Sequence, residues 1–331
     1  MAQKKVTAIE ITRLAQDLKL GAKSDPWDAI IKYCEKRIQK ICADKSCESL
    51  SDLLRWVAED VGTIFREIRN NKELEDIKSE YCSRGEKIFA NVENELSDEQ
   101  SFGITYQLQH QEVFENPHVS IIDCRGAKLA RSYFTKWHEI AHLLTLTDQM
   151  RLVFRRTHSS SVSGANPEER LMDAIAGKVG FYDGIFHKHI KEEISFGEIE
   201  RLRSILCPDA SQQASQINFI KNWSAPCIHI TIGLGLKREE EESLKQGSFF
   251  FVDPPTKVLR ALRTEPNDKA REIDFRLFTN MRIPENSIIS KVYSENLPYA
   301  EAVEAEWQWE FPVKVKVRNY NGSIDALIIL A

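Results

Sequence analysis

The sequence predicts an α+β fold with a mostly helical N-terminal half and a strand-rich α+β module at the C-terminus. Apolar residues recur at helical spacing between residues 25 and 94, and apolar and polar side chains alternate from Phe102 to Leu108. Several short runs typical of strands follow residue 246. A chain of 331 residues is long enough for two or three domains. We therefore expect a helical region at 1–95, a core at 96–205, a helical connector at 206–245 and the α+β module at 246–331.

The elements before residue 246 follow from local patterns. Alternation with a period of two indicates the strands, and a period near 3.6 indicates the helices. Asn166 and Pro167 mark a helix start, because asparagine caps a helix and proline is accepted in its first turn. In chain order we expect helical stripes at 27–38 and 53–68, a helix near 81–92, strands at 102–108 and 118–124, and helices at 128–145, from 167, at 196–206 and at 210–223.

The C-terminal module is predicted from its β-branched and alternating runs. Val313, Val315 and Val317 alternate with basic residues, and Asn321–Gly322 connects this run to the next one, which is a strong hairpin signal. The strand candidates are 249–252, 273–278, 288–293, 313–318 and 324–330. The acidic run at 239–242 is expected to be a solvated surface.

Composition argues against several classes of function. The 45 basic and 50 acidic residues give a net charge of −5, so we do not expect direct nucleic-acid binding. A DNA-binding regulator that uses 210–223 is disfavoured further, because Lys221 is the basic residue of that segment. The sequence has no apolar run of 18 residues, so we expect no membrane span. Seven cysteines without a CxxC pair fit free thiols and a cytoplasmic protein.

An HExxH sequence lies inside the helix predicted at 128–145. His138 and His142 stand one helical turn apart, so both imidazoles can bind one metal ion, and Glu139 lies near the same ion. Zinc lowers the pKa of its water to about 7, and a neighbouring carboxylate can take the proton during attack on a peptide carbonyl. We therefore expect Zn²⁺ or Mn²⁺ as cofactor, His138 and His142 as ligands and Glu139 as general base.

A third protein ligand is needed, and Glu169 is the favoured candidate. The metzincin pattern would require glycine and histidine where this chain has Thr145 and Asp148. Glu169 lies in the first turn of the helix from Pro167, and Asp173 follows four residues later on the same face. Asp173 is expected to accept a hydrogen bond from the far nitrogen of a ligand histidine. The alternative is that Glu169 forms a capping box with Asn166.

Four further side chains could stabilise a transition state, but we expect them to be ordinary polar residues: His158, His187, His189 and Tyr182.

The region from about residue 100 to 185 resembles the ImmA/IrrE-type metallopeptidases. Residues 131–142 are similar to that family's RFTxxHExxH segment, and Glu169, Met172, Asp173 and Ala176 are similar to its following ExxA[ND]xxA helix. The resemblance implies a gluzincin-like core, with a small antiparallel sheet packed on the helix of the HExxH sequence. It also implies cleavage of a helix-turn-helix repressor in bacterial stress or mobile-element regulation, and a sensor-like or regulatory C-terminal module.

We expect a cytoplasmic zinc endopeptidase whose substrate is a transcriptional repressor. The competing interpretation is a weakly active or inactive regulatory protein that keeps the metallopeptidase fold for protein binding. A peptidase must also hold its substrate in an extended form, so we expect Phe102–Leu108 or His118–Cys124 to be an edge strand that pairs with the peptide. The alternative is that both strands are interior.

Overall fold

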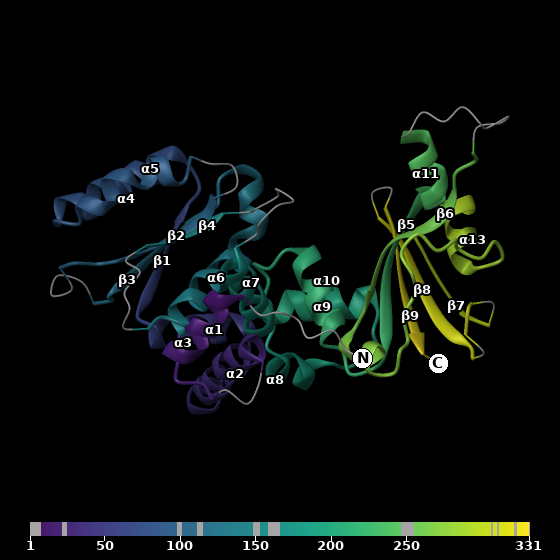
Figure 1. The fold of residues 1–331 in the computed structure, drawn as a ribbon, viewed down its shortest axis with the longest axis horizontal. Coiled ribbons are helices and arrows are strands. Elements are labelled where there is room, and N and C mark those ends of the chain that lie inside the picture. The colour runs from purple at the N-terminus through teal and green to yellow at the C-terminus, as the bar shows by residue number, and fades with distance from the viewer. Residues whose placement is uncertain are drawn as a thin grey trace. The chain divides into compact units, whose positions relative to one another are not determined.

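The computed structural model shows the α+β fold that the sequence predicts (Figure 1). It describes residues 8–21, 25–97, 101–110, 115–147, 153–157, 166–245, 255–305, 307–309, 311–320 and 323–330, with only the backbone of 153–157, 245 and 320. The described chain divides into two compact units. The first unit comprises residues 1–190 and 201–215, and the second comprises 191–200 and 216–331.

The first unit contains a four-stranded sheet and the helices around it. Its strands are β1 (Thr63–Ile68), β2 (Ser101–Gln107), β3 (His118–Asp123) and β4 (Val153–Thr157). Its α-helices are α1 (Ile9–Asp17), α2 (Pro26–Lys45), α3 (Leu50–Asp60), α4 (Asn71–Ser83), α5 (Val92–Glu95), α6 (Ser132–Leu144), α7 (Pro167–Gly180) and α8 (Asp183–Phe186). Short 3₁₀ helices are η1 (Lys87–Asn91), η3 (Gly126–Arg131) and η4 (His187–His189).

The strand order of this sheet is β1-β3-β2-β4, with β1 parallel to β3 and the other pairs antiparallel. One face carries Ile104, Tyr106, Val119 and Ile121, which pack against α4, η1 and α5 in one apolar cluster. The other face carries Gly103, Thr105 and Ser120 and lies against α6. The strands β2 and β3 are therefore buried on both faces, and the polar positions of 102–108 face a helix rather than water.

The expectation that β2 or β3 forms a free edge is wrong. β3 lies between β1 and β2, and β2 lies between β3 and β4. Alternation in a single strand shows which residues share a face, but it does not show which strands lie beside it. Among the described residues, β1 and β4 form the two edges of this sheet.

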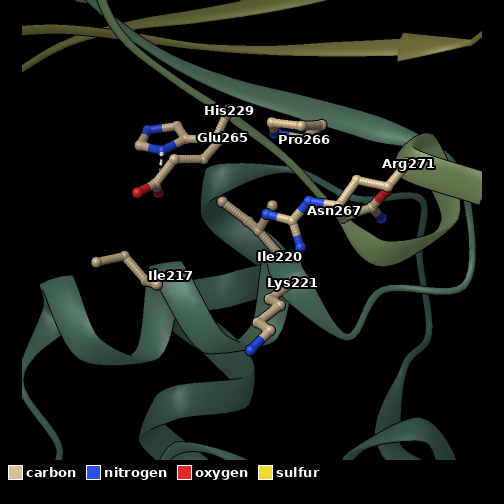
Figure 2. Close-up of a pocket in the computed structure, with 8 residues that line it drawn as sticks. All are labelled: Ile217, Ile220, Lys221, His229, Glu265, Pro266, Asn267 and Arg271. Carbon is tan, nitrogen blue, oxygen red and sulfur yellow. Dashed lines mark ion pairs between the residues drawn. The ribbon is translucent and has the colours of Figure 1, made fainter. Parts of the chain in front are cut away.

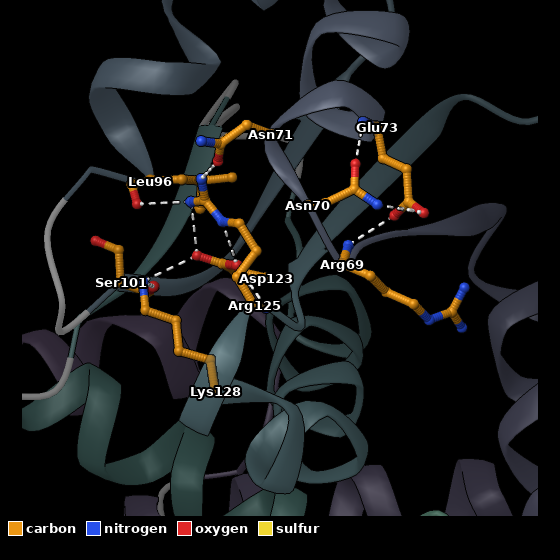
Figure 3. A network of polar contacts seen from close by, with 9 residues as sticks. All are labelled: Arg69, Asn70, Asn71, Glu73, Leu96, Ser101, Asp123, Arg125 and Lys128. Atoms are coloured by element: carbon orange, nitrogen blue, oxygen red, sulfur yellow. Dashed lines mark hydrogen bonds and ion pairs between the residues drawn. The ribbon is translucent and has the colours of Figure 1, made fainter.

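A polar cluster at the end of β3 fixes the entry into η3 and α6 (Figure 3). The buried Asp123 carboxylate accepts hydrogen bonds from the Arg125 guanidinium at 2.8 and 2.9 Å and from Lys128 Nζ at 2.9 Å. Arg125 also donates to Asn71 Oδ1, and Lys128 donates to the Ser101 carbonyl. Burial raises the pKa of Asp123, but these two cations outweigh that effect and lower it. The cluster ties α4, β2 and β3 to the start of the α6 segment.

The second unit contains a five-stranded antiparallel sheet with the order β6-β5-β9-β8-β7. Its strands are β5 (Cys227–Gly235), β6 (Val258–Pro266), β7 (Tyr299–Glu304), β8 (Val313–Tyr320) and β9 (Ser323–Leu330). Its other helices are α11 (Arg238–Lys245), α12 (Asp268–Glu272) and α13 (Ile288–Glu295), while α9 (Phe196–Leu206) and α10 (Gln212–Lys221) each span residues of both units.

The two faces of this second sheet differ chemically. Val313, Val315 and Val317 share one aliphatic core with Ile228 and Ile328. The intervening residues of β8 are basic, and they pair with acidic or polar residues. Lys314 and Lys316 contact Glu193 at 2.6 and 3.2 Å, and Arg318 contacts Asp325 at 3.3 Å.

Several predicted elements are confirmed. Helices occur at 26–45, 50–60, 132–144, 167–180, 196–206 and 212–221, and strands occur at 101–107, 118–123, 313–320 and 323–330. The β8–β9 hairpin is present, with Tyr320 opposite Ser323. The strand predicted at 249–252 lies outside the described residues.

Other predicted elements are wrong. The stripe at 53–68 is interrupted because α3 ends at Asp60 and Gly62 adopts φ +67°, after which β1 begins. Residues 288–293 form α13 rather than a strand, since the Ser287 side chain caps the helix by accepting from Ser290 N. Residues 273–278 are not a strand, and the helix expected near 81–92 is replaced by α4 and the short turns that follow it.

Strand β5 lies inside the segment expected to be a helical connector. Ile228, Ile230 and Ile232 alternate with His229 and Thr231, so the period-two signal was present in the sequence. The strands β1, β4, β6 and β7 were also not predicted.

Within the part of the chain that the structure describes, none of the helices combines the length and apolar character needed to cross a membrane. The seven cysteines are free thiols, as predicted. Burial raises the pKa of Cys34, Cys207 and Cys227 to about 12, so these thiols are poor nucleophiles at neutral pH.

Candidate metal centre

The two histidines of the HExxH sequence lie on the buried helix α6. The helix ends where Thr145 Oγ1 donates to the Ala141 carbonyl at 2.9 Å, so His142 belongs to its last turn. His138 is 1% exposed and His142 is 3% exposed. Their Nε2 atoms lie 3.2 Å apart, as expected for imidazoles one helical turn apart on the same face.

Helix α7 runs antiparallel to α6 and brings Glu169 to the histidines. Near one end of the pair, Tyr133 Oη donates to the Gly180 carbonyl at 2.6 Å, and near the other Thr145 contacts Met172 Sδ at 3.6 Å. The helix begins as predicted, with Asn166 Oδ1 accepting from Glu168 N and Pro167 in the first turn. The carboxylate of Glu169 is directed to the imidazoles.

Three electron-pair donors converge at this point. Glu169 Oε2 lies 3.1 Å from His138 Nε2, and Glu169 Oε1 lies 3.4 Å from His142 Nε2. The two nitrogens lie 3.2 Å apart, so the three side chains form a donor triangle in which each carboxylate oxygen faces one imidazole. Zinc bonds of about 2.0 Å in tetrahedral geometry place neighbouring ligand atoms about 3.3 Å apart. The donor types and their spacing therefore fit a tetrahedral zinc ion with one position left for a non-protein ligand.

Asp173 sets the orientation of His138. Its Oδ1 lies 2.9 Å from His138 Nδ1, on the opposite side of the ring from Glu169. Donation of the Nδ1 proton to this carboxylate leaves the Nε2 lone pair directed at the donor triangle, which is the tautomer a metal ligand needs. Burial raises the pKa of Glu169, but its contacts with His138 and His142 outweigh that effect and hold the pKa well below its usual range.

Glu139 points to the sheet and is completely buried. Its Oε2 accepts a hydrogen bond from Thr105 Oγ1 at 2.7 Å. Thr105 Oγ1 lies 2.7 Å from Ser120 Oγ, which lies 3.0 Å from Thr63 Oγ1. Three hydroxyls on three adjacent strands thus form a hydroxyl ladder that ends on the Glu139 carboxylate.

Gly103 allows α6 to approach β2 closely at this ladder. A Cβ at this position would lie 2.7 Å from Thr135 Cγ2 and 3.0 Å from Glu139 Oε1, both too close for ordinary contact. The glycine therefore leaves the space that the Glu139 carboxylate occupies.

The structure brings together four of the predicted site residues, His138, His142, Glu169 and Asp173, whereas Glu139 of α6 points to the sheet. The donor cluster found among the described residues includes neither His187 nor His189. Asp148 and His158 lie outside the described residues. The hydroxyls of Thr63, Thr105 and Ser120 were not predicted as part of the site, although Thr105 lies on the polar side of the strand predicted at 102–108.

A scan against protein-family models and a search of curated protein sequences both found no match for this chain.

Proposed function

We propose that this protein is a cytoplasmic metal-dependent endopeptidase of the ImmA/IrrE type that cleaves a protein substrate, a transcriptional repressor. The observation that carries the proposal is the convergence of His138 Nε2, His142 Nε2 and the Glu169 carboxylate, whose nearest atoms lie 3.1 to 3.4 Å apart. Two neutral imidazoles and one carboxylate are the protein ligands of a known class of catalytic zinc site. The fourth position is then left for water or substrate.

His138, His142 and Glu169 would hold Zn²⁺ or Mn²⁺, and the ion would supply Lewis-acid chemistry to a bound peptide carbonyl. Asp173 keeps His138 in the tautomer required of a ligand. Glu139 is the general base of the proposal, and its carboxylate takes a proton from the attacking water and passes it to the leaving amine. Thr105 holds one carboxylate oxygen of Glu139 in a defined direction.

A second candidate is a regulatory protein that binds its partner without cleaving it. The burial of Glu139 and its hydrogen bond to Thr105 favour this candidate, because a carboxylate bound into the sheet can serve structure alone. The two proposals share the metal and differ in whether Glu139 has a chemical role.

Metal analysis tests the shared part. Purified protein should hold about one equivalent of Zn²⁺ or Mn²⁺, and His138→Ala, His142→Ala and Glu169→Ala should each lose most of it. His189→Ala is the matched control, since this histidine lies outside the donor cluster, and it should retain the metal. Retention of full occupancy in Glu169→Ala would show that the third ligand is assigned wrongly.

Cleavage assays separate the two candidates, and a peptide library allows them to be run before the substrate is identified. Metal-loaded protein is incubated with a proteome-derived peptide library and with a repressor encoded near its gene, and new termini are identified by mass spectrometry. Glu139→Gln should retain metal and produce no new termini, because glutamine preserves the shape of the side chain and cannot accept the proton. Identical products from this variant would rule out Glu139 as the general base, and no products from the wild type on either substrate would favour the regulatory candidate.

A further inference from the structure

The second unit contains a cavity of about 190 Å³ that the proposed peptidase chemistry does not use (Figure 2). Helix α10 forms one wall, strands β5 and β6 form the opposite wall, and α12 closes one side. The side chains that line the cavity include Ile217, Ile220, Lys221, His229, Glu265 and Arg271.

A fixed polar pair lines the strand wall. His229 and Glu265 lie directly opposite each other in the β5–β6 register, and His229 Nδ1 is 3.8 Å from Glu265 Oε2. On the other side of the ring, Gln216 Nε2 is 2.9 Å and Asp325 Oδ1 is 3.3 Å from His229 Nε2. The imidazole is 7% exposed, so its orientation is set by neighbours that the fold already supplies. The Glu265 carboxylate, which also pairs with Arg263, is thereby held at the cavity in a defined position.

Arg271 brings an opposite charge to the same space. Its guanidinium pairs with Asp268 through Nη1 at 2.8 Å, and Figure 2 shows the side chain extending from α12 between the helix and the strands. Lys221 at the end of α10 adds a second positive charge to the lining. A carboxylate and a guanidinium therefore border one cavity, and Ile217 and Ile220 supply its apolar wall.

Size and charge exclude other ligand classes. The cavity volume corresponds to about six water molecules in the liquid, and it is below the roughly 300 Å³ at which sites for drug-sized ligands begin. The cavity volume therefore favours a ligand much smaller than a nucleotide. A metal ion is disfavoured because Arg271 places a permanent positive charge beside the His229–Glu265 donor pair.

We propose that this cavity binds a small α-amino acid with an apolar side chain. The ammonium group would lie on Glu265, the carboxylate would lie on Arg271, and the side chain would pack on Ile217 and Ile220. A zwitterion offers a partner to a charge of each sign in the lining, whereas a simple acid or a simple amine offers a partner to only one of them. The proposal does not depend on the metal site, and its test requires no peptidase activity.

Isothermal titration calorimetry on the full-length protein tests the ligand class with three matched probes. L-leucine carries both charges, 4-methylpentanoate lacks the ammonium group, and 3-methylbutylamine lacks the carboxylate. We expect saturable binding of L-leucine with a Kd of about 1 mM or tighter, and each of the other two should bind at least about tenfold more weakly. No saturable binding of L-leucine, or equally tight binding of either singly charged probe, would overturn the proposal.

Variants of the lining locate the site and test each contact. Glu265→Gln should weaken the binding of L-leucine about tenfold and leave the affinity for 4-methylpentanoate unchanged. Arg271→Gln should also weaken the binding of L-leucine about tenfold, but it should leave the affinity for 3-methylbutylamine unchanged. Glu272→Gln and Lys269→Gln are matched controls, because this exposed pair on α12 does not line the cavity. Ile217→Phe should abolish binding by filling the volume without any change of charge. Wild-type affinity in Glu265→Gln and Arg271→Gln would show that leucine binds elsewhere and would overturn the assignment.

Discussion

Both units contain a sheet with one buried polar face, but they build this face from different groups. Beneath α6 the polar groups are the neutral hydroxyls of Thr63, Ser120 and Thr105, and they end on the carboxylate of Glu139. In the second unit the corresponding groups are ions in pairs, such as Lys316 with Glu193 and Arg318 with Asp325.

The difference follows from desolvation. A hydroxyl costs less to bury than an ion, and it can either donate or accept, so a row of hydroxyls can hold one carboxylate without a counter-charge. Buried ions need partners on every side, and their pairing depends on pH. The first arrangement therefore holds Glu139 with neutral groups, whereas the second depends on the charge state of each partner.

The largest expected difference between the two sheets is the response to zinc. Ligand binding stabilises only the structure that contains the donor triangle, by about 4 kcal/mol at a zinc concentration one thousand times Kd. Hydrogen exchange measured by mass spectrometry should therefore slow in peptides from α6 and α7 and remain unchanged in β5 to β9. His142→Ala should show no response in either unit. Equal protection of both sheets would contradict the assignment of the metal to the first unit.

Overpacking at the hydroxyl ladder should have the next largest effect. Gly103→Ala places a Cβ against Thr135 and Glu139, so we expect a loss of about 1–3 kcal/mol in the free energy of unfolding, measured by denaturant titration. Gly197→Ala on α9 is the matched control, because no atom lies closer than 3.9 Å to its added Cβ. That variant should be neutral or more stable by up to about 1 kcal/mol, since alanine favours a helix. Equal losses of unfolding free energy in both variants would show that the close approach of α6 to β2 is not the cause of the destabilisation.

Removal of one hydroxyl from each polar face compares the two directly. Thr105→Val deletes the donor that joins Glu139 to Ser120, and we expect a loss of about 1–2 kcal/mol. Thr231→Val deletes a bond to Asp325, which keeps contacts with Arg318 and His229, so its loss should be smaller. Thr105→Ser restores the hydroxyl and should recover most of the stability. A larger loss in Thr231→Val would contradict the distinction between the two faces.

The smallest expected effect is a dependence on pH that comes from His229 in the second unit. Burial lowers the pKa of His229, but the hydrogen bonds to Asp325 and Glu265 outweigh it and raise the pKa above 6.5. The pKa values of both carboxyls are lowered: burial of Asp325 is outweighed by His229, and Glu265 is lowered mainly by His229. The stability that comes from the raised pKa of His229 is fully present below about pH 6.5, and it is lost as the pH rises through the pKa of His229 in the folded protein. The stability that comes from the lowered pKa values of the two carboxyls is present above about pH 4, where both are ionised in the unfolded chain, and it is lost as the pH falls.

The difference in unfolding free energy between wild type and His229→Gln should therefore be greatest between about pH 4.5 and 6.5, at about 1 kcal/mol, and decline on both sides. His189→Gln, which changes a histidine of η4 in the first unit, should show no such maximum. A difference that is constant from pH 4 to 9 would show that the imidazole does not change charge in this network.

The sequence predicted elements well where one periodic pattern coincided with a cap or turn signal. Asn166–Pro167 marked the start of α7, and Asn321–Gly322 marked the β8–β9 hairpin. The prediction was wrong at residues 61–68, where apolar residues have helical spacing although Thr63–Ile68 forms a strand. Val61, Phe65 and Ile68 have helical spacing, yet the backbone at Gly62 has φ +67° and β1 pairs with β3 from a segment more than 50 residues away.

The candidate site was predictable because its chemistry is local in sequence. A spacing of four residues places His138 and His142 on one face of any helix, and the same spacing relates Glu169 to Asp173. The sequence left open whether Glu169 faces its own helix terminus or the histidines. The antiparallel packing of α7 on α6, with Tyr133 on the Gly180 carbonyl, directs Glu169 to the imidazoles in the structure.

By itself the sequence determined the α+β class, the HExxH helix and the composition of the donor set, because these depend on the identity and spacing of residues within single elements. Only the tertiary structure decided that β2 and β3 are interior, that the polar side of β2 is buried beneath α6, and that hydroxyls on three strands meet Glu139. Strand order and contacts across a sheet join residues distant in the chain, and periodicity along one strand carries no record of its neighbours.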